Sequence, residues 1–118
     1  MVRIKRVYEP RSAEDGYRLL IMRKWPRGIR REAVDAWDKE LGPSLELLAG
    51  FRLGRISWPD YVERYTAEMR RKPGLVHALA DRARKETVTL LCGCPEEKRC
   101  HRSVLKRLVE EATKGSGH

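Results

Sequence analysis

Three cysteines, a histidine and an arginine lie close together in one short segment near the end of the chain. Cys92, Cys94 and Cys100 are the only cysteines of the sequence, and Cys100 is followed directly by His101 and Arg102. An odd and clustered set of cysteines is not the disulfide framework of a small secreted protein. We therefore expect this segment to be a site whose chemical groups are thiols, an imidazole and a guanidinium.

The position of this segment favours the binding of an anion. A predicted strand over Thr87–Leu91 precedes it, and a predicted helix begins near Cys100. Ligands of open α/β sheets bind beyond the carboxyl ends of the strands, and the free N–H groups at a helix start attract negative charge. Arg102, with Arg99 as a further candidate, would complement a phosphate or a carboxylate. The alternative is that the basic residues of this region form only a solvated surface.

The same residues support a catalytic hypothesis. A cysteine at a helix N-terminus beside cationic side chains tends towards the thiolate, so Cys100 is the candidate nucleophile and Cys92 the second choice. His101 would move the proton, and Arg102 would stabilise a phosphoryl or acyl oxyanion. The alternative is a small buried cysteine in the first helical turn, with His101 at the surface. The phosphatase loop and the redox C-x-x-C motif are both absent from this segment.

A metal site and a disulfide are two further uses of the thiols. Cys92, Cys94, Cys100 and His101 supply three sulfurs and a nitrogen, the number and softness that tetrahedral zinc requires. Their spacing disfavours zinc, because structural sites typically use C-x2-4-C pairs and adjacent Cys and His residues are a poor arrangement. A disulfide from Cys100 to Cys92 or Cys94 would instead act as a staple. We therefore expect no cofactor, with zinc as the alternative.

A second cluster of basic residues follows another predicted strand, Tyr17–Met22, which comes earlier in the chain. If this strand and Thr87–Leu91 are parallel neighbours, both basic segments leave the sheet at the same edge. Trp25 would stack on a base or ring and Tyr17 would add a hydroxyl, although a core position is the commoner role of tryptophan. The predicted ligand-binding residues are Tyr17, Arg23, Trp25, Arg27, Cys92 and Arg102.

The elements that must position these residues alternate between strands and helices. Apolar runs predict three strands, in Val2–Tyr8, Tyr17–Met22 and Thr87–Leu91. Helical spacing of apolar residues predicts about five helices, which cover Val34–Leu41, a stretch capped by Ser44, Trp58–Met69, Leu75–Ala83 and a last helix from Cys100. The expected fold is a single small three-layer α/β domain over residues 1–113, with a short, largely parallel sheet, followed by a flexible tail over 114–118.

Composition limits the partners. The 118 residues include 26 Lys and Arg against 17 Asp and Glu, a formal charge of +9, so an anionic small molecule or nucleic acid is the expected partner. No apolar stretch is long enough to cross a membrane, and the first residues do not form a signal peptide, so we expect a cytoplasmic protein without a membrane partner. The absence of Asn and Gln indicates a thermophilic origin.

Several blocks of the sequence resemble the YeaO-like proteins, within the wider group known as domain of unknown function 488. The resemblance covers nearly the whole chain and rests on Lys5-Arg6-Val7-Tyr8-Glu9-Pro10, Asp15-Gly16-Tyr17-Arg18, Trp25-Pro26-Arg27-Gly28, Pro43-Ser44 and the helix of Trp58, Tyr61 and Tyr65. The pattern Leu90-Leu91-Cys92, seven residues, then Cys100-His101-Arg102 resembles the wider group. The resemblance implies a compact α/β fold and a small bacterial or archaeal cytosolic protein, and it implies no settled activity.

Three hypotheses of function follow from the residues. The first is an intracellular protein that binds a phosphorylated ligand, either a nucleotide or a nucleic-acid backbone, through Arg23, Arg27 and Arg102. The second is a small enzyme in which Cys100 attacks a phosphoryl or acyl group and His101 moves the proton. The third is a structural protein held by a zinc ion or a disulfide.

Overall fold

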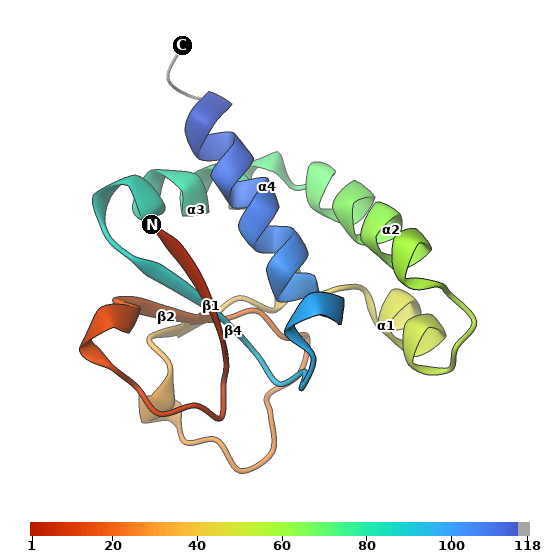
Figure 1. Ribbon diagram of the computed structural model, residues 1–118, viewed down its shortest axis with the longest axis horizontal. Coiled ribbons are helices and arrows are strands. Elements are labelled where there is room, and N and C mark those ends of the chain that lie inside the picture. Colours follow the sequence, from red (N-terminus) through yellow and green to blue (C-terminus); the bar gives the residue numbers. More distant parts are fainter. Residues whose placement is uncertain (116–118) are drawn as a thin grey trace.

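A four-stranded parallel sheet forms the centre of the protein in a computed structural model, which describes residues 1–115 (Figure 1). Its strands are β1 (Val2–Arg6), β2 (Tyr17–Leu20), β3 (Ala36–Trp37) and β4 (Val88–Cys92), arranged in the order β1-β4-β2-β3. All three neighbouring pairs are parallel. Every residue of the central strand β4 is buried, as expected for a continuous apolar run in a parallel sheet. The α/β class and the parallel sheet predicted from the sequence are confirmed.

Four α-helices connect and cover the strands. They are α1 (Leu45–Arg52), α2 (Trp58–Arg70), α3 (Pro73–Lys85) and α4 (His101–Gly115). Ser44 caps α1 by accepting a hydrogen bond from the Leu47 N–H, and Ser57 caps α2 in the same way through the Asp60 N–H. These side chains satisfy N–H groups that have no partner inside the helix, which fixes where each helix begins.

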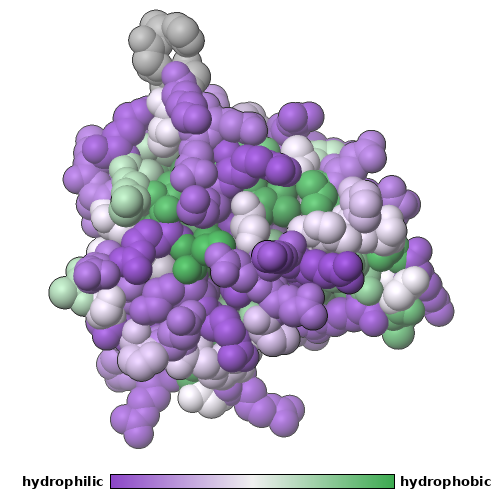
Figure 2. All heavy atoms as spheres, viewed as in Figure 1, coloured by the Kyte–Doolittle hydropathy of each residue, from purple (hydrophilic) through white to green (hydrophobic). Residues whose placement is uncertain are grey.

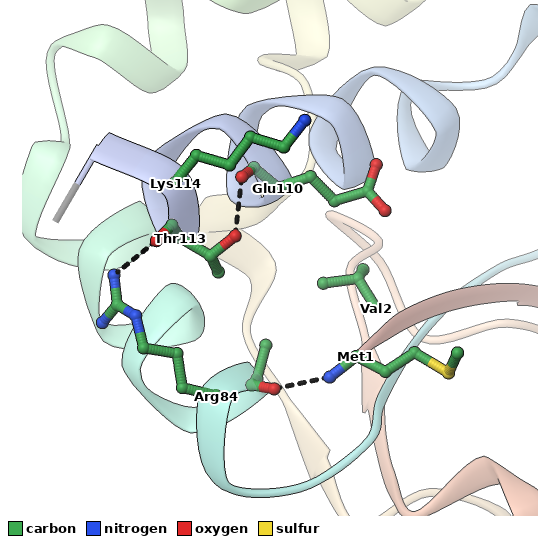
Figure 3. A pocket seen from close by; sticks show the side chains of 7 residues that line it. Met1, Val2, Arg84, Glu110, Thr113 and Lys114 are labelled. Carbon is green, nitrogen blue, oxygen red and sulfur yellow. Dashed lines mark hydrogen bonds between the residues drawn. The ribbon is translucent and has the colours of Figure 1, made fainter. Parts of the chain in front are cut away.

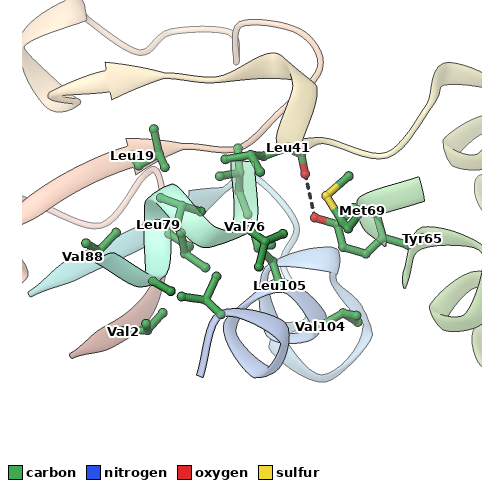
Figure 4. Packing of buried hydrophobic residues seen from close by; sticks show 14 of the residues in the cluster. Val2, Leu19, Leu41, Tyr65, Met69, Val76, Leu79, Val88, Val104 and Leu105 are labelled. Carbon is green, nitrogen blue, oxygen red and sulfur yellow. Dashed lines mark hydrogen bonds between the residues drawn. The ribbon is translucent and has the colours of Figure 1, made fainter. Parts of the chain in front are cut away.

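The sheet separates two apolar clusters. The larger cluster joins one face of the sheet to the buried sides of the helices, where Leu19 and Val88 lie against Val76 and Leu79 of α3 and Leu105 of α4 (Figure 4). The smaller cluster on the opposite face contains Val7, Leu20 and Leu91, and it is covered by Met22, Trp25, Ile29 and Val34. The sheet therefore lies between a helical layer and a layer of irregular chain, which we call the loop layer.

The predicted helix over Val34–Leu41 is wrong. This segment instead contains β3 and a short 3₁₀ turn at Lys39–Leu41. The N–H groups of Asp35 and Asp38 donate to the carbonyls of Arg18 and Leu20, so the backbone pairs with β2 as an edge strand. This pairing across the chain overrides a helical spacing that was only a local preference.

The surface and the chain end agree with a strongly charged sequence. The face drawn in Figure 2 is covered largely by hydrophilic side chains. Within residues 1–115, no helix has the length and apolar character needed to cross a membrane. The tail predicted over residues 114–118 overlaps the end of α4, and residues 116–118 lie outside the described residues.

Candidate functional site

The three cysteines meet at the carboxyl end of β4. Cys92 is the last residue of this strand, and the chain returns through a 3₁₀ turn at Glu97–Arg99 so that Cys100 directly precedes α4. The three sulfur atoms lie within 4.8 Å of one another, and the Sγ atoms of Cys92 and Cys94 are 3.5 Å apart. All three are free cysteines, so the disulfide considered from the sequence is not formed. We call Cys92, Cys94, Cys100 and His101 the thiol cluster.

His101 faces the sulfurs from the first turn of α4. Its ring is buried, with 3% exposure, so the alternative hypothesis that His101 lies at the surface is wrong. Its Nε2 lies 2.6 Å from the Ile21 carbonyl oxygen, which only an N–H donor can approach, and this places the proton on Nε2. The unprotonated Nδ1 therefore points towards Cys92 and Cys100, with 3.9 Å to each Sγ. Burial lowers the pKa of His101, which favours this neutral form.

The three thiols differ in how easily they ionise. Hydrogen bonds from Cys100 and Cys92, helped by the nearby Arg102, lower the pKa of Cys94 to about 2. A hydrogen bond from Cys100 lowers the pKa of Cys92, but the hydrogen bond to Cys94 and burial raise it to about 11. Hydrogen bonds to the other two cysteines and burial raise the pKa of Cys100 well above its ordinary value. The thiol that ionises first is therefore Cys94, which is half-buried, and not Cys100, which is 1% exposed.

Arg102 joins the thiol cluster to the edge of β1. Its Nη1 donates to the Cys94 carbonyl at 2.9 Å and to the Cys92 carbonyl at 3.4 Å. The Cys92 carbonyl also accepts from the Val7 N–H, at 2.9 Å. The Arg102 side chain is buried, and its Nε has no hydrogen-bond partner among the described residues. A guanidinium has five N–H donors, so Arg102 keeps unused donors at this edge.

Arg6 is a residue of this edge that the sequence analysis missed. It is the Cα partner of Cys92 in the register of β1 and β4, and its Nε is also buried without a hydrogen-bond partner in the described part of the chain. Its guanidinium lies 5.3 Å from the centre of the Tyr8 ring, and the Tyr8 hydroxyl donates to the Arg27 carbonyl at 3.4 Å. Applying the strand-end argument to the first predicted strand as well would have identified Arg6, since this residue lies near its carboxyl end.

Arg6, Arg27 and Arg102 share a further property. Among the described residues, no carboxylate lies within 4.0 Å of any of these three guanidinium groups. A methyl group placed on Gly93 would lie 3.6 Å from the Tyr8 ring, so the loop after β4 also reaches this place. We call Arg6, Tyr8, Arg27 and Arg102 the edge site.

Arg23 follows the carboxyl end of β2, but its side chain contacts the loop before α1. Its guanidinium donates to the carbonyls of Pro43 at 3.1 Å and Gly42 at 3.0 Å, and it forms an ion pair with Glu40 at 3.2 Å. These contacts fasten the loop before α1 to the end of β2. The structure therefore gives Arg23 a positioning contact, and the ligand contact predicted from the sequence stays a prediction.

Trp25 and Tyr17 lie away from the thiol cluster. Trp25 packs in the loop layer, its indole N–H donates to the Ile29 carbonyl, and its ring centre is 5.4 Å from that of Trp37. These two rings line a hollow of about 470 Å³ that the cysteines do not reach. Tyr17 begins β2 at the opposite end of the strand, where the Arg82 guanidinium lies 3.7 Å from its ring centre.

A pocket at the other end of β1 is also separate from the edge site. It has a volume of about 420 Å³ and is lined by Met1, Val2, Arg84, Glu110 and Lys114, among others (Figure 3). The amino group of Met1 donates to the Ala83 carbonyl in this pocket. Parallel strands direct their amino ends here and their carboxyl ends to the thiol cluster, so the two places lie at opposite edges of the sheet.

Comparison with known proteins identifies the family. A family model described as the active DUF488-N3 subclade matches residues 2–113. The chain belongs to the YeaO-like DUF488 family. This DUF488 chain is 40% identical to the uncharacterised protein YeaO of Escherichia coli over 106 residues, which cover 88% of the chain and 92% of that protein. It is 32% identical over 110 residues to uncharacterised proteins of Mycobacterium bovis and Mycobacterium tuberculosis, with 92% of each chain covered. No solved structure matches it.

Proposed function

We propose that this protein binds a phosphate-bearing ligand, either a nucleotide or the backbone of a nucleic acid, at the edge site. The observation that carries the proposal is the set of three arginines at one sheet edge without a carboxylate partner among the described residues: Arg6 pairs with Cys92 there, the Arg27 carbonyl accepts from Tyr8, and Arg102 donates to the Cys92 and Cys94 carbonyls. Because no carboxylate neutralises these three guanidinium groups among the described residues, their charges can attract an anion to this edge.

The layout of the edge supports a small site more than a broad basic surface. Arg27 is exposed and Arg6 is partly exposed, whereas Arg102 is buried and donates to the carbonyls of Cys92 and Cys94. α4 begins one residue before Arg102, and the positive end of a helix dipole adds to the charge near Arg102. A phosphate group would therefore contact Arg6 and Arg27, with the buried Arg102 as a further fixed charge at this edge.

Nucleophilic catalysis by Cys100 receives less support from the geometry. Cys100 is 1% exposed and His101 is 3% exposed, so neither reaches a ligand held at the surface. The His101 Nδ1 is also 3.9 Å from the Cys100 sulfur, which is long for a proton transfer in the resting protein. The description of the matched subclade as active names no reaction, and we therefore propose binding as the function.

Fluorescence anisotropy with a labelled single-stranded DNA oligonucleotide tests this proposal. Loss of a charge-assisted hydrogen bond costs about 1.5–3 kcal/mol, so we expect Arg6→Gln and Arg27→Gln each to weaken binding by about tenfold or more. Arg55→Gln is the matched control, since Arg55 is exposed, carries the same charge and lies between α1 and α2. Equal losses in all three variants would overturn the proposal, because they would show a response to net charge alone.

The salt dependence of the same binding separates a small site from a basic surface. One phosphate bound on a single strand predicts a slope of about −0.7 for the logarithm of the association constant against the logarithm of salt concentration. We expect competition by a nucleoside monophosphate as well, since one phosphate group fills the edge site. A much steeper slope without competition would contradict the edge site and indicate a diffuse basic surface.

A further inference from the structure

The thiol cluster has the geometry of a metal centre, and this conclusion is independent of the edge site. We propose that Cys92, Cys94, Cys100 and His101 bind one zinc ion. A tetrahedral zinc ion holds sulfur at about 2.3 Å, so two sulfurs on the same ion lie about 3.8 Å apart. The separation of 3.5 Å between Cys92 and Cys94, and the limit of 4.8 Å for all three sulfurs, fit one such ion with small side-chain adjustments.

The imidazole supplies the fourth ligand in the tautomer that a metal needs. His101 donates from Nε2 to the Ile21 carbonyl, which leaves the lone pair of Nδ1 directed at the sulfurs of Cys92 and Cys100. Histidine ligands of metals almost always donate their other ring N–H to a carbonyl or carboxylate, and this partner fixes the orientation of the ring. The 3.9 Å from Nδ1 to each sulfur exceeds the separation of about 3.5 Å expected for nitrogen and sulfur on one zinc ion by only a few tenths of an ångström.

The backbone conformation explains how side chains at this unusual spacing converge on one centre. Cys100 has φ −137° and ψ 144°, so it is extended and lies just before the helix that begins at His101. Two adjacent helical residues would point about 100° apart, but an extended residue followed by a helical one can turn both side chains towards one centre. The C-x-C pair is directed to the same place because Cys92 ends a strand and Gly93 follows it.

Charge and burial agree with a bound cation. Cys92, Cys100 and His101 are each at most 3% exposed, so three sulfurs and a nitrogen lone pair face one another largely away from water. One zinc ion with three thiolates and a neutral imidazole has a net charge of −1. The buried Arg102 lies next to this group through the carbonyls of Cys92 and Cys94, so its charge is compensated when the ion is bound. Soft thiolate donors with one imidazole select zinc over calcium or magnesium.

Cobalt substitution in the full chain tests the proposal under reducing conditions. We expect one Co²⁺ per chain, with the sulfur-to-cobalt charge-transfer band and the visible bands of tetrahedral geometry, and displacement of the cobalt by zinc. Changes outside the ligand sphere already cost 10–100-fold in metal affinity, so Cys94→Ser and His101→Gln should weaken cobalt binding by more than about 100-fold. His77→Gln is the control, because His77 is exposed on α3, and it should leave the band unchanged.

Each outcome bears on the proposal. Circular dichroism of every variant shows whether it is folded, and Cys94→Ser is the more tolerant variant because Cys94 is only half-buried. If a variant unfolds, the wild-type protein decides the question through its cobalt stoichiometry and spectrum. Folded, reduced wild-type protein that binds no cobalt would overturn the proposal. An unchanged charge-transfer band in folded Cys94→Ser or His101→Gln would do the same.

Discussion

Replacement of Asp15 by asparagine is the sharpest test of how this fold tolerates buried charge. The Asp15 carboxylate is fully buried and accepts hydrogen bonds from Lys5 at 2.9 Å, Arg18 at 2.6 Å and the Ser12 N–H at 3.1 Å. Asp15→Asn keeps the shape but leaves the guanidinium of Arg18, which is 1% exposed, without its counter-ion. Removing one partner of a buried pair costs about 3–5 kcal/mol, which corresponds to a fall of roughly 10–20 °C in Tm for a domain of this size.

The loss of stability in Asp15→Asn should depend on pH. Burial raises the pKa of Asp15, but hydrogen bonds from Lys5, Ser12 and Arg18 outweigh it and hold this pKa well below its usual range. A carboxyl group with a depressed folded pKa stabilises the protein above its unfolded pKa of about 3.9, and it loses this contribution as the pH falls towards the folded pKa. The difference between wild type and Asp15→Asn should therefore be largest near neutral pH and become smaller below about pH 4.

Urea unfolding at neutral and acidic pH measures both effects. Glu14→Gln is the matched control, because Glu14 is the neighbouring acid, its side chain is 82% exposed and its ion pair with Arg3 spans 3.5 Å. An exposed pair of this kind contributes about 0–1 kcal/mol. Equal losses of unfolding free energy in the two variants, or an Asp15→Asn deficit that is the same at pH 7 and pH 3, would refute the reasoning.

Two other substitutions test close contacts that stabilise the fold. Gly16→Ala should destabilise the fold by about 1–3 kcal/mol or more, because φ is +60° and the added Cβ would lie 2.3 Å from the Thr87 carbonyl oxygen. Gly74→Ala is the control in the same thermal unfolding assay, because a Cβ at Gly74 meets open space. A loss as large in Gly74→Ala would contradict the account. Tyr65→Phe should cost about 1–3 kcal/mol in urea unfolding, because the Tyr65 hydroxyl donates to the buried Leu41 carbonyl at 2.6 Å. Tyr61→Phe removes no hydrogen bond between described residues and should have the smaller effect, so a reversed order would refute the assignment.

The sequence was informative wherever a local pattern coincided with the tertiary contacts. Thr87–Leu91 consists of β-branched and apolar residues, and it is indeed the buried central strand, shifted by one residue to Val88–Cys92. The Ser57 cap and the Pro59 that follows it predicted the start of α2. Val34–Leu41 was misread because Val34, Trp37 and Leu41 also suit an edge strand followed by a turn, and only the pairing of Asp35 and Asp38 with β2 decides between them.

The candidate site was predictable in its residues but less so in its contacts. The cysteine, histidine and arginine of the last loop could be selected because rare reactive side chains cluster there. Their approach depends on Cys100 being extended while His101 is helical, and spacing alone does not determine that boundary. Arg23 also donates to the carbonyls of Gly42 and Pro43, and these contacts could not be predicted because they form only when the two segments are folded together.

An NMR titration of the labelled protein with inorganic phosphate tests the edge site most directly. The account predicts saturable shifts of the Arg6 and Arg27 side-chain N–H signals and of the Gly93 and Cys94 amides, with the signals of Arg55 unchanged. Shifts that never saturate, or that move Arg55 as much as Arg6, would contradict a specific phosphate site at the carboxyl edge of this sheet.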